Sequence, residues 1–198
     1  NPERWVLLDK VNDDYKNISQ EFADLGLNFV FTGHFHANDI VMAKSSKSFL
    51  YDIETGSLVT YPVPVRSIII KESKKMEIST KYVSNINFDT KGIGFREYSR
   101  QYLVNDLDSF VAGILIDQFK IDKLIADEIA PVGVRAFLAH SEGDEIIAKD
   151  AIDLIEKYRN DNNLTIKLFM VTLESVYKDL NPADNNITIN MTTGEVIK

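Results

Sequence analysis

The chain of 198 residues contains no cysteine. This absence excludes disulfide bonds and thiolate metal sites, so any metal in the protein would be held by histidine and oxygen ligands. Basic residues are also scarce, because 22 lysines and arginines stand against 30 aspartates and glutamates, for a formal net charge of -8. A nucleic-acid surface needs a basic patch that neutralises phosphates, so we expect no nucleic-acid polymer as a partner.

Long apolar runs are missing as well. None approaches the roughly 20 residues that a membrane-spanning helix needs, so the sequence predicts a soluble chain without a membrane span. The chain opens at Asn1 without an initiator methionine, which we interpret as a cut. A signal peptide would be lost with such a cut, so cytoplasmic and periplasmic locations both stay open.

Histidine occurs three times, and two of the three lie together. His34 and His36 follow the apolar run 28–31 and Gly33, where we expect a buried strand to end. In an extended segment, residues i and i+2 point to the same side, and a glycine before them lets the backbone turn tightly. Imidazole binds Zn, Mn, Fe and Ni, so the pattern indicates half of a metal site. The alternative is two histidines that pack or face water.

Residues 31–40, which read FTGHFHANDI, resemble the last catalytic motif, G-H-x-H, of the calcineurin-like metallophosphoesterases. Residues 54–66, which read ETGSLVTYPVPVR, are similar to a T-G-S-L…Y-P…R segment of bacterial members. The resemblance covers about the first half of the chain.

The family implies a binuclear metal centre built from D-x-H, G-D-x-x-D, G-N-H-[D/E], a lone histidine and G-H-x-H, in that order. Only the last motif is present here. The nearest match to the second motif, residues 143–147, has isoleucine in place of the second aspartate and follows G-H-x-H in the chain. We therefore expect the C-terminal part of a phosphoesterase, inactive alone, in which no catalytic residue can be named.

By this resemblance, His34 would bind one and His36 the other of two divalent ions (Mn, Fe or Zn) that activate a water to hydrolyse a phosphate ester. A ligating imidazole usually donates its other N–H to an oxygen, and Asn38 and Asp39 are candidates, although both can equally be turn residues. Arg66 could bind a substrate phosphate in a bidentate way, although an ordinary surface arginine at a strand start fits the same pattern.

The hydrophobic pattern predicts an α/β (α+β) fold. We expect a helix over 12–25, strands over 28–32, 49–53, 65–71 and 77–83, and a hairpin turn at Lys74 and Lys75. The resemblance implies that residues 1–90 are the C-terminal portion of a four-layer αββα phosphoesterase sandwich.

Residues 91–198 form a mostly helical appendage in this interpretation. We expect a helix over 95–128 ended by Pro131, a second helix over 132–160, and a helix or strand over 164–180. Residues 187–197 then read as a β-hairpin with a glycine at its turn.

The third histidine, His140, lies among acids at 139–145. It suggests a second metal site, but a solvated helix face or a local salt bridge explains it better. Gly143, which we place inside this helix, indicates a close contact or a kink.

A second hypothesis is a non-catalytic module, in which the helical half mediates interaction or dimerisation. A homodimer is then a possible assembly. If the chain is a fragment, we expect apolar strand edges to be exposed where its missing neighbours would lie.

Overall fold

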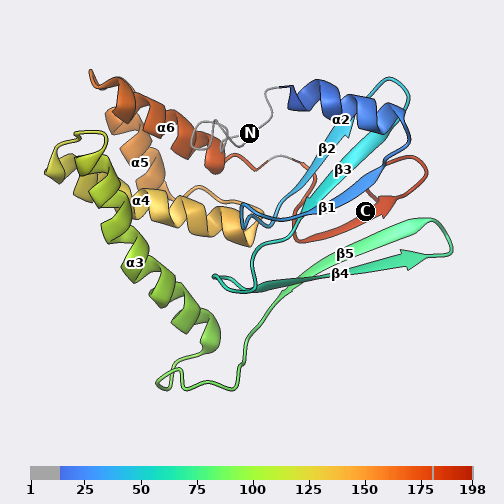
Figure 1. Cartoon of the computed structure of the whole chain (residues 1–198), viewed down its shortest axis with the longest axis horizontal. Helices are drawn as coiled ribbons and strands as arrows, with labels where there is room; N and C mark the ends of the chain where they lie inside the picture. Colours follow the sequence, from blue (N-terminus) through green and yellow to red (C-terminus); the bar gives the residue numbers. More distant parts are fainter. Residues whose placement is uncertain (1–13, 180, 198) are drawn as a thin grey trace.

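The structure is a computed structural model, which describes residues 14–179 and 181–197 (Figure 1). Its helices are α2 (Tyr15–Asp24), α3 (Phe95–Asp117), α4 (Lys123–Glu142), α5 (Lys149–Tyr158) and α6 (Leu164–Val176). Its strands are β1 (Phe29–Thr32), β2 (Ile40–Lys44), β3 (Phe49–Glu54), β4 (Pro64–Lys71), β5 (Lys75–Tyr82) and β6 (Asn186–Asn190). The expected α+β class is confirmed.

Two three-stranded sheets form a sandwich. One has the order β1-β3-β2, with β1 parallel and β2 antiparallel to β3, and the other is the antiparallel sheet β4-β5-β6. The core between them is apolar and consists of Ile40, Phe49, Tyr51, Ile53, Met76, Ile78, Ile187 and Ile189. Helix α2 packs on β2 and β3, so the described residues supply an α-β-β stack.

The helices α3 to α6 lie beside the sandwich rather than on its second sheet (Figure 1). They enclose their own core, which is built around Ile129, Met170 and Leu173. A smaller cluster joins the two halves, because Tyr61 from the sandwich side packs against Val134 and Leu138 of α4. None of the helices in the described ranges is long and apolar enough to cross a bilayer.

Most predicted elements of the sandwich are confirmed. Helix α2 and the strands β1, β3, β4 and β5 lie where the periodicity placed them, although Asn12, the predicted first residue of the helix, lies outside the described residues. The hairpin turn has Lys74 at φ 59°, with its N–H donating to the Lys71 carbonyl at 3.0 Å. The C-terminal hairpin is also present, and its strand β6 joins the edge of β5.

The helix boundaries of the second half were wrong. The expected helix 95–128 divides into α3 and α4, because Asp122 caps a new helix by accepting a hydrogen bond from the Leu124 N–H at 2.8 Å. Pro131 lies inside α4 instead of ending it, and its neighbours Ala130 and Val132 are buried. The burial of both neighbours thus offsets the loss of the backbone hydrogen bond that proline cannot make.

The expected helix 132–160 is also interrupted. Gly143 ends α4 with φ 73°, a left-handed conformation that favours glycine. A β-carbon at Gly143 would lie 2.3 Å from the Asn38 carbonyl oxygen, so the expected close contact exists, but at the helix end. Of residues 164–180, left open between helix and strand, Leu164–Val176 form α6, while Leu180 lies outside the described residues. Strand β2 was missed.

Substitution of Gly194, at the turn of the C-terminal hairpin, tests how tightly this turn packs on the sandwich core. Its φ is 72°, and a β-carbon would lie 2.5 Å from a ring atom of Phe49. We expect Gly194→Ala to lower the free energy of unfolding by about 1–3 kcal/mol, through overpacking and a disfavoured φ. Urea denaturation measures this change.

Gly113→Ala is the matched control, because Gly113 lies inside α3 and a β-carbon there would meet nothing within 4 Å. It should stabilise the protein by up to about 1 kcal/mol. Equal effects of the two substitutions would contradict the packing of Gly194 on Phe49.

Candidate metal-binding loop

The two adjacent histidines lie in the loop that leaves the carboxyl end of β1 and enters β2, which we call the histidine loop (residues 33–39). His34 has φ 107° and His36 has φ 62°. A positive φ is uncommon for a residue with a side chain, and two in three residues are more so. Such conformations cost about 1–3 kcal/mol each and cluster at functional sites.

This geometry corrects the expectation for the loop backbone. His34 and His36 do not lie in an extended segment, so the alternation of a strand does not aim their side chains. Gly33 has an ordinary φ, and a β-carbon there would lie 3.7 Å from the Thr55 carbonyl oxygen, an ordinary contact. The tight turn is therefore made by the histidines themselves and not by the glycine.

The segment that follows β3 fixes the histidine loop. The Phe35 N–H donates to Oε1 of Glu54 at 3.0 Å, and the Thr55 N–H donates to the Thr32 carbonyl at 3.1 Å. A β-carbon at Gly56 would lie 3.0 Å from the His36 carbonyl oxygen and 2.9 Å from Cγ of Pro64. Only glycine fits here without displacing the loop.

The two imidazoles differ in their surroundings. His34 is exposed, and its ring packs edge-on against Phe35, with 5.2 Å between the ring centroids. His36 is half-buried, and its Nδ1 lies 3.3 Å from Oγ1 of Thr60. In the tautomer in which Nδ1 donates to this hydroxyl, Nε2 presents its lone pair to a metal.

Thr60 is thus a candidate orienting residue that the sequence did not reveal. Its only signal was its place inside the T-G-S-L…Y-P segment.

The Asn38 amide nitrogen and the Asp39 carbonyl bond to segments outside the histidine loop. Asn38 is fully buried, and its side chain donates to Oδ1 of Asn185 at 2.6 Å. The backbone carbonyl of Asp39 accepts from the Glu54 N–H at 2.9 Å. Both residues therefore help to join the loop to the rest of the fold.

Arg66 is occupied by backbone carbonyls. It donates from Nη1 to the Glu54 carbonyl at 2.5 Å and from Nη2 to the Asp184 carbonyl at 2.9 Å. Longer contacts reach the Asp39 carbonyl at 3.4 Å and Oγ1 of Thr80 at 3.3 Å. Each of its three nitrogens has an oxygen partner, so the guanidinium ties together segments that are far apart in the sequence.

Asp184 anchors the chain between α6 and β6. Its carboxylate accepts from the Ile40 N–H at 2.8 Å and from the Asp144 N–H at 2.9 Å, and Asp144 accepts in return from the Asp184 N–H at 2.8 Å. Burial, together with the negative charges of Asp39 and Glu145, raises the pKa of Asp184 to about 8.

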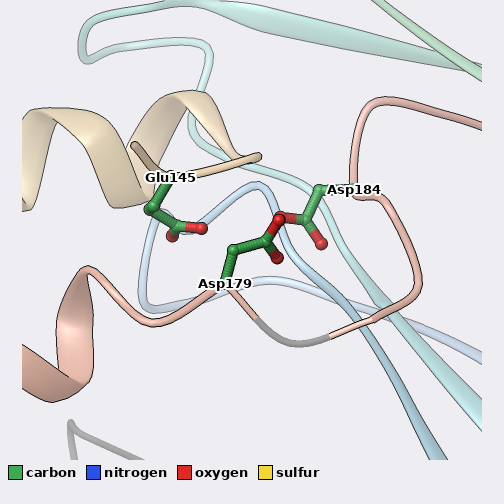
Figure 2. A group of neighbouring side chains, drawn as sticks. All are labelled: Glu145, Asp179 and Asp184. Atoms are coloured by element: carbon green, nitrogen blue, oxygen red, sulfur yellow. The ribbon is translucent and has the colours of Figure 1, made fainter. Parts of the chain in front are cut away.

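Asp184 also lies in an acidic group with Glu145 and Asp179, whose oxygens converge in Figure 2. One ligand atom of each residue lies within 4.8 Å of the others. Glu145 also contacts His140, with 2.7 Å between Oε1 and Nδ1, so the expected local salt bridge of His140 is confirmed, but in a largely buried place. These partners make the group a structural junction.

A comparison with protein-family models finds no match, and a comparison with curated proteins finds none either.

Arg66→Ala tests the hydrogen bonds from the guanidinium to the Glu54 and Asp184 carbonyls. Removing the guanidinium leaves the Glu54 and Asp184 carbonyls without their donor, so we expect the free energy of unfolding to fall by about 2–4 kcal/mol. Lys71→Ala is the control, because Lys71 lies in the same strand but pairs with Glu77 at the surface, and it should cost less than about 1 kcal/mol. Equal stability of the two variants in urea denaturation would contradict this role of Arg66.

The raised pKa of Asp184 predicts a pH dependence. The pKa is about 8 in the folded state and about 3.9 in the unfolded state, so between these values the folded state binds a proton that the unfolded state lacks. Stability should therefore fall as pH rises from about 4 to about 8, with a slope of at most about 1.4 kcal/mol per pH unit. Urea denaturation at several pH values measures this slope.

Asp184→Asn should remove the contribution of Asp184 to the slope of stability against pH, even though the variant is less stable at every pH. Asp106→Asn, at an exposed acid of α3, should keep the slope of the unaltered protein. The assignment to Asp184 is wrong if the slope of Asp184→Asn equals that of Asp106→Asn.

Proposed function

We propose that this chain is the C-terminal part of a dimetal phosphoesterase, in which His34 and His36 each hold one divalent ion and the remaining ligands come from outside this sequence. The observation that carries the proposal is the pair of histidines with positive φ at the carboxyl end of β1. A fold keeps such strain where its surroundings impose it, and metal binding would repay its cost.

The donor set fits a metal. Both ligands are imidazoles, one of them exposed, and the loop offers no sulfur, which agrees with Mn, Fe or Zn as the ion. Thr60 would fix the tautomer of His36, while Glu54 and Gly56 would fix the loop backbone. When bound, two such ions supply the Lewis acidity and the activated water that hydrolyse a phosphate mono- or diester.

In this proposal Arg66 stabilises the fold and does not bind the substrate, because its donors already bond to backbone carbonyls. The same holds for Asn38, whose amide donates to Asn185. The orienting role that the sequence offered to Asn38 and Asp39 passes to Thr60.

A second candidate is a surface for a protein partner or a second copy on α3. Leu115 is its one buried residue among the 23 that the helix contains, whereas Tyr102 and Phe110 are 68% and 63% exposed. Such a large apolar exposure on a long helix is typical of an interaction face.

The metal content of the full-length gene product tests the proposal. We expect two metals per chain by elemental analysis, together with hydrolysis of p-nitrophenyl phosphate or bis-p-nitrophenyl phosphate. His34→Ala and His36→Ala should each lose a metal and the turnover, because each removes a ligand. Thr60→Val should weaken metal binding about 10–100-fold.

His140→Ala is the control, because His140 is the remaining histidine and pairs with Glu145. It should keep the metals and the turnover. Unchanged metal content in His34→Ala would overturn the ligand assignment. A full-length protein without metal or turnover would favour the interaction face on α3.

A further inference from the structure

A cavity of about 630 Å³ lies at the other end of the sandwich from the histidine loop. It opens between the β2–β3 turn, which precedes β3, and the C-terminal turn, whereas the histidine loop is fixed by residues that follow β3. Its lining consists of residues 42, 44–49, 51 and 192–196. Pockets of about 300–1,000 Å³ are the usual size for small ligands.

Two lysines line this cavity, Lys44 and Lys47. In the β2–β3 register Lys44 pairs with Phe49 and Ile40 pairs with Ile53, so Ile40, Met42 and Lys44 share one face of the strand. That face points to the core between the sheets, where Ile40 and Phe49 are buried. Met42 and Lys44 lie farther along this face, toward the β2–β3 turn, where both are exposed and line the cavity.

The two lysines of the cavity differ in their ion pairs. Among the described residues Lys44 forms no ion pair, whereas Lys47 pairs with Asp24 at 3.6 Å. The one acidic residue of the lining, Glu195, accepts a hydrogen bond from Oγ1 of Thr193 at 3.1 Å. The lining therefore holds two lysines and one carboxylate, a formal charge of +1 in a chain with a net charge of -8.

Hydrogen-bond donors surround the same space. Ser45 fixes the β2–β3 turn, because its hydroxyl accepts from the N–H groups of Lys47 at 3.2 Å and Ser48 at 2.9 Å. Within the described ranges, the backbone N–H and the hydroxyl of Ser46 have no partner, and neither has the hydroxyl of Thr192. A cation with several free donors is the combination that binds the oxygens of a phosphate group.

We infer that this cavity binds the phosphate group of a small ligand, with Lys44 as its cation and Ser46 and Thr192 as hydrogen-bond donors. The inner wall at Met42, Phe49 and Val196 is apolar and can accept a compact organic group attached to the phosphate. The site is independent of the proposed metal centre, because it lies at the opposite end of β3 and uses neither histidine.

The test is a titration of the chain with phosphate compounds in the absence of divalent metals, in which the amide chemical shifts report binding. Inorganic phosphate and phenyl phosphate are the probes, and phenol is the control at matched ionic strength. We expect saturable binding with shifts at Ser46 and Thr192. Tighter binding of phenyl phosphate would identify an organic phosphate as the ligand, and equal binding would identify inorganic phosphate.

Substitutions separate a site from general charge attraction. Lys44→Ala should weaken phosphate binding about tenfold or more, since a hydrogen bond to a charged group contributes about 1.5–3 kcal/mol. Lys44→Arg should retain most of the affinity. Lys81→Ala removes an exposed lysine of β5 outside the cavity, and it should bind as the unaltered chain does.

Several results would overturn the inference. These are chemical-shift changes that do not saturate, an equal loss of phosphate affinity in Lys44→Ala and Lys81→Ala, or phenol that binds as tightly as phenyl phosphate. Because Lys44 is exposed, its substitution should leave the fold intact, and unchanged shifts elsewhere in the spectrum check this.

Discussion

The guanidinium of Arg66 joins three segments of the sandwich that lie far apart in the sequence. It lies in β4, yet it holds the carbonyls of Glu54 at the end of β3 and of Asp184 before β6. These two segments flank the histidine loop and the return of the chain to the sandwich. A planar cation with donors in several directions can tie together carbonyls that no regular strand pairing would satisfy.

Around this guanidinium the two halves of the molecule meet through buried polar groups. Asn38 and Asn185 contact each other, and Asp184 and Asp144 exchange backbone hydrogen bonds with their carboxylates. Such groups are costly to bury unless they are paired, so they specify one arrangement of the helical half against the sandwich. The histidine loop joins this network through Asn38. These contacts provide surroundings that can hold residues in a strained conformation.

The sequence predicted what depends on local pattern. Alternation and apolar runs located β1, β3, β4 and β5, and a glycine marked the C-terminal turn. It failed at Pro131, which continues a helix because its neighbours Ala130 and Val132 are buried by the rest of the fold. It also missed the local cap at Asp122, which starts α4 after α3 has ended at Asp117. In the candidate site, the motif drew attention to His34 and His36, but the partner of His36 is Thr60, 24 residues later, and no local pattern predicts that contact.

Anomalous diffraction from crystals of the full-length protein, measured at the absorption edges of Mn, Fe and Zn, shows whether His34 and His36 hold metal ions. We expect two peaks, one at about 2.0–2.2 Å from an imidazole nitrogen of His34 and the other at that distance from an imidazole nitrogen of His36. Peaks on the acidic group of Glu145, Asp179 and Asp184, or no peak at either histidine, would contradict this expectation.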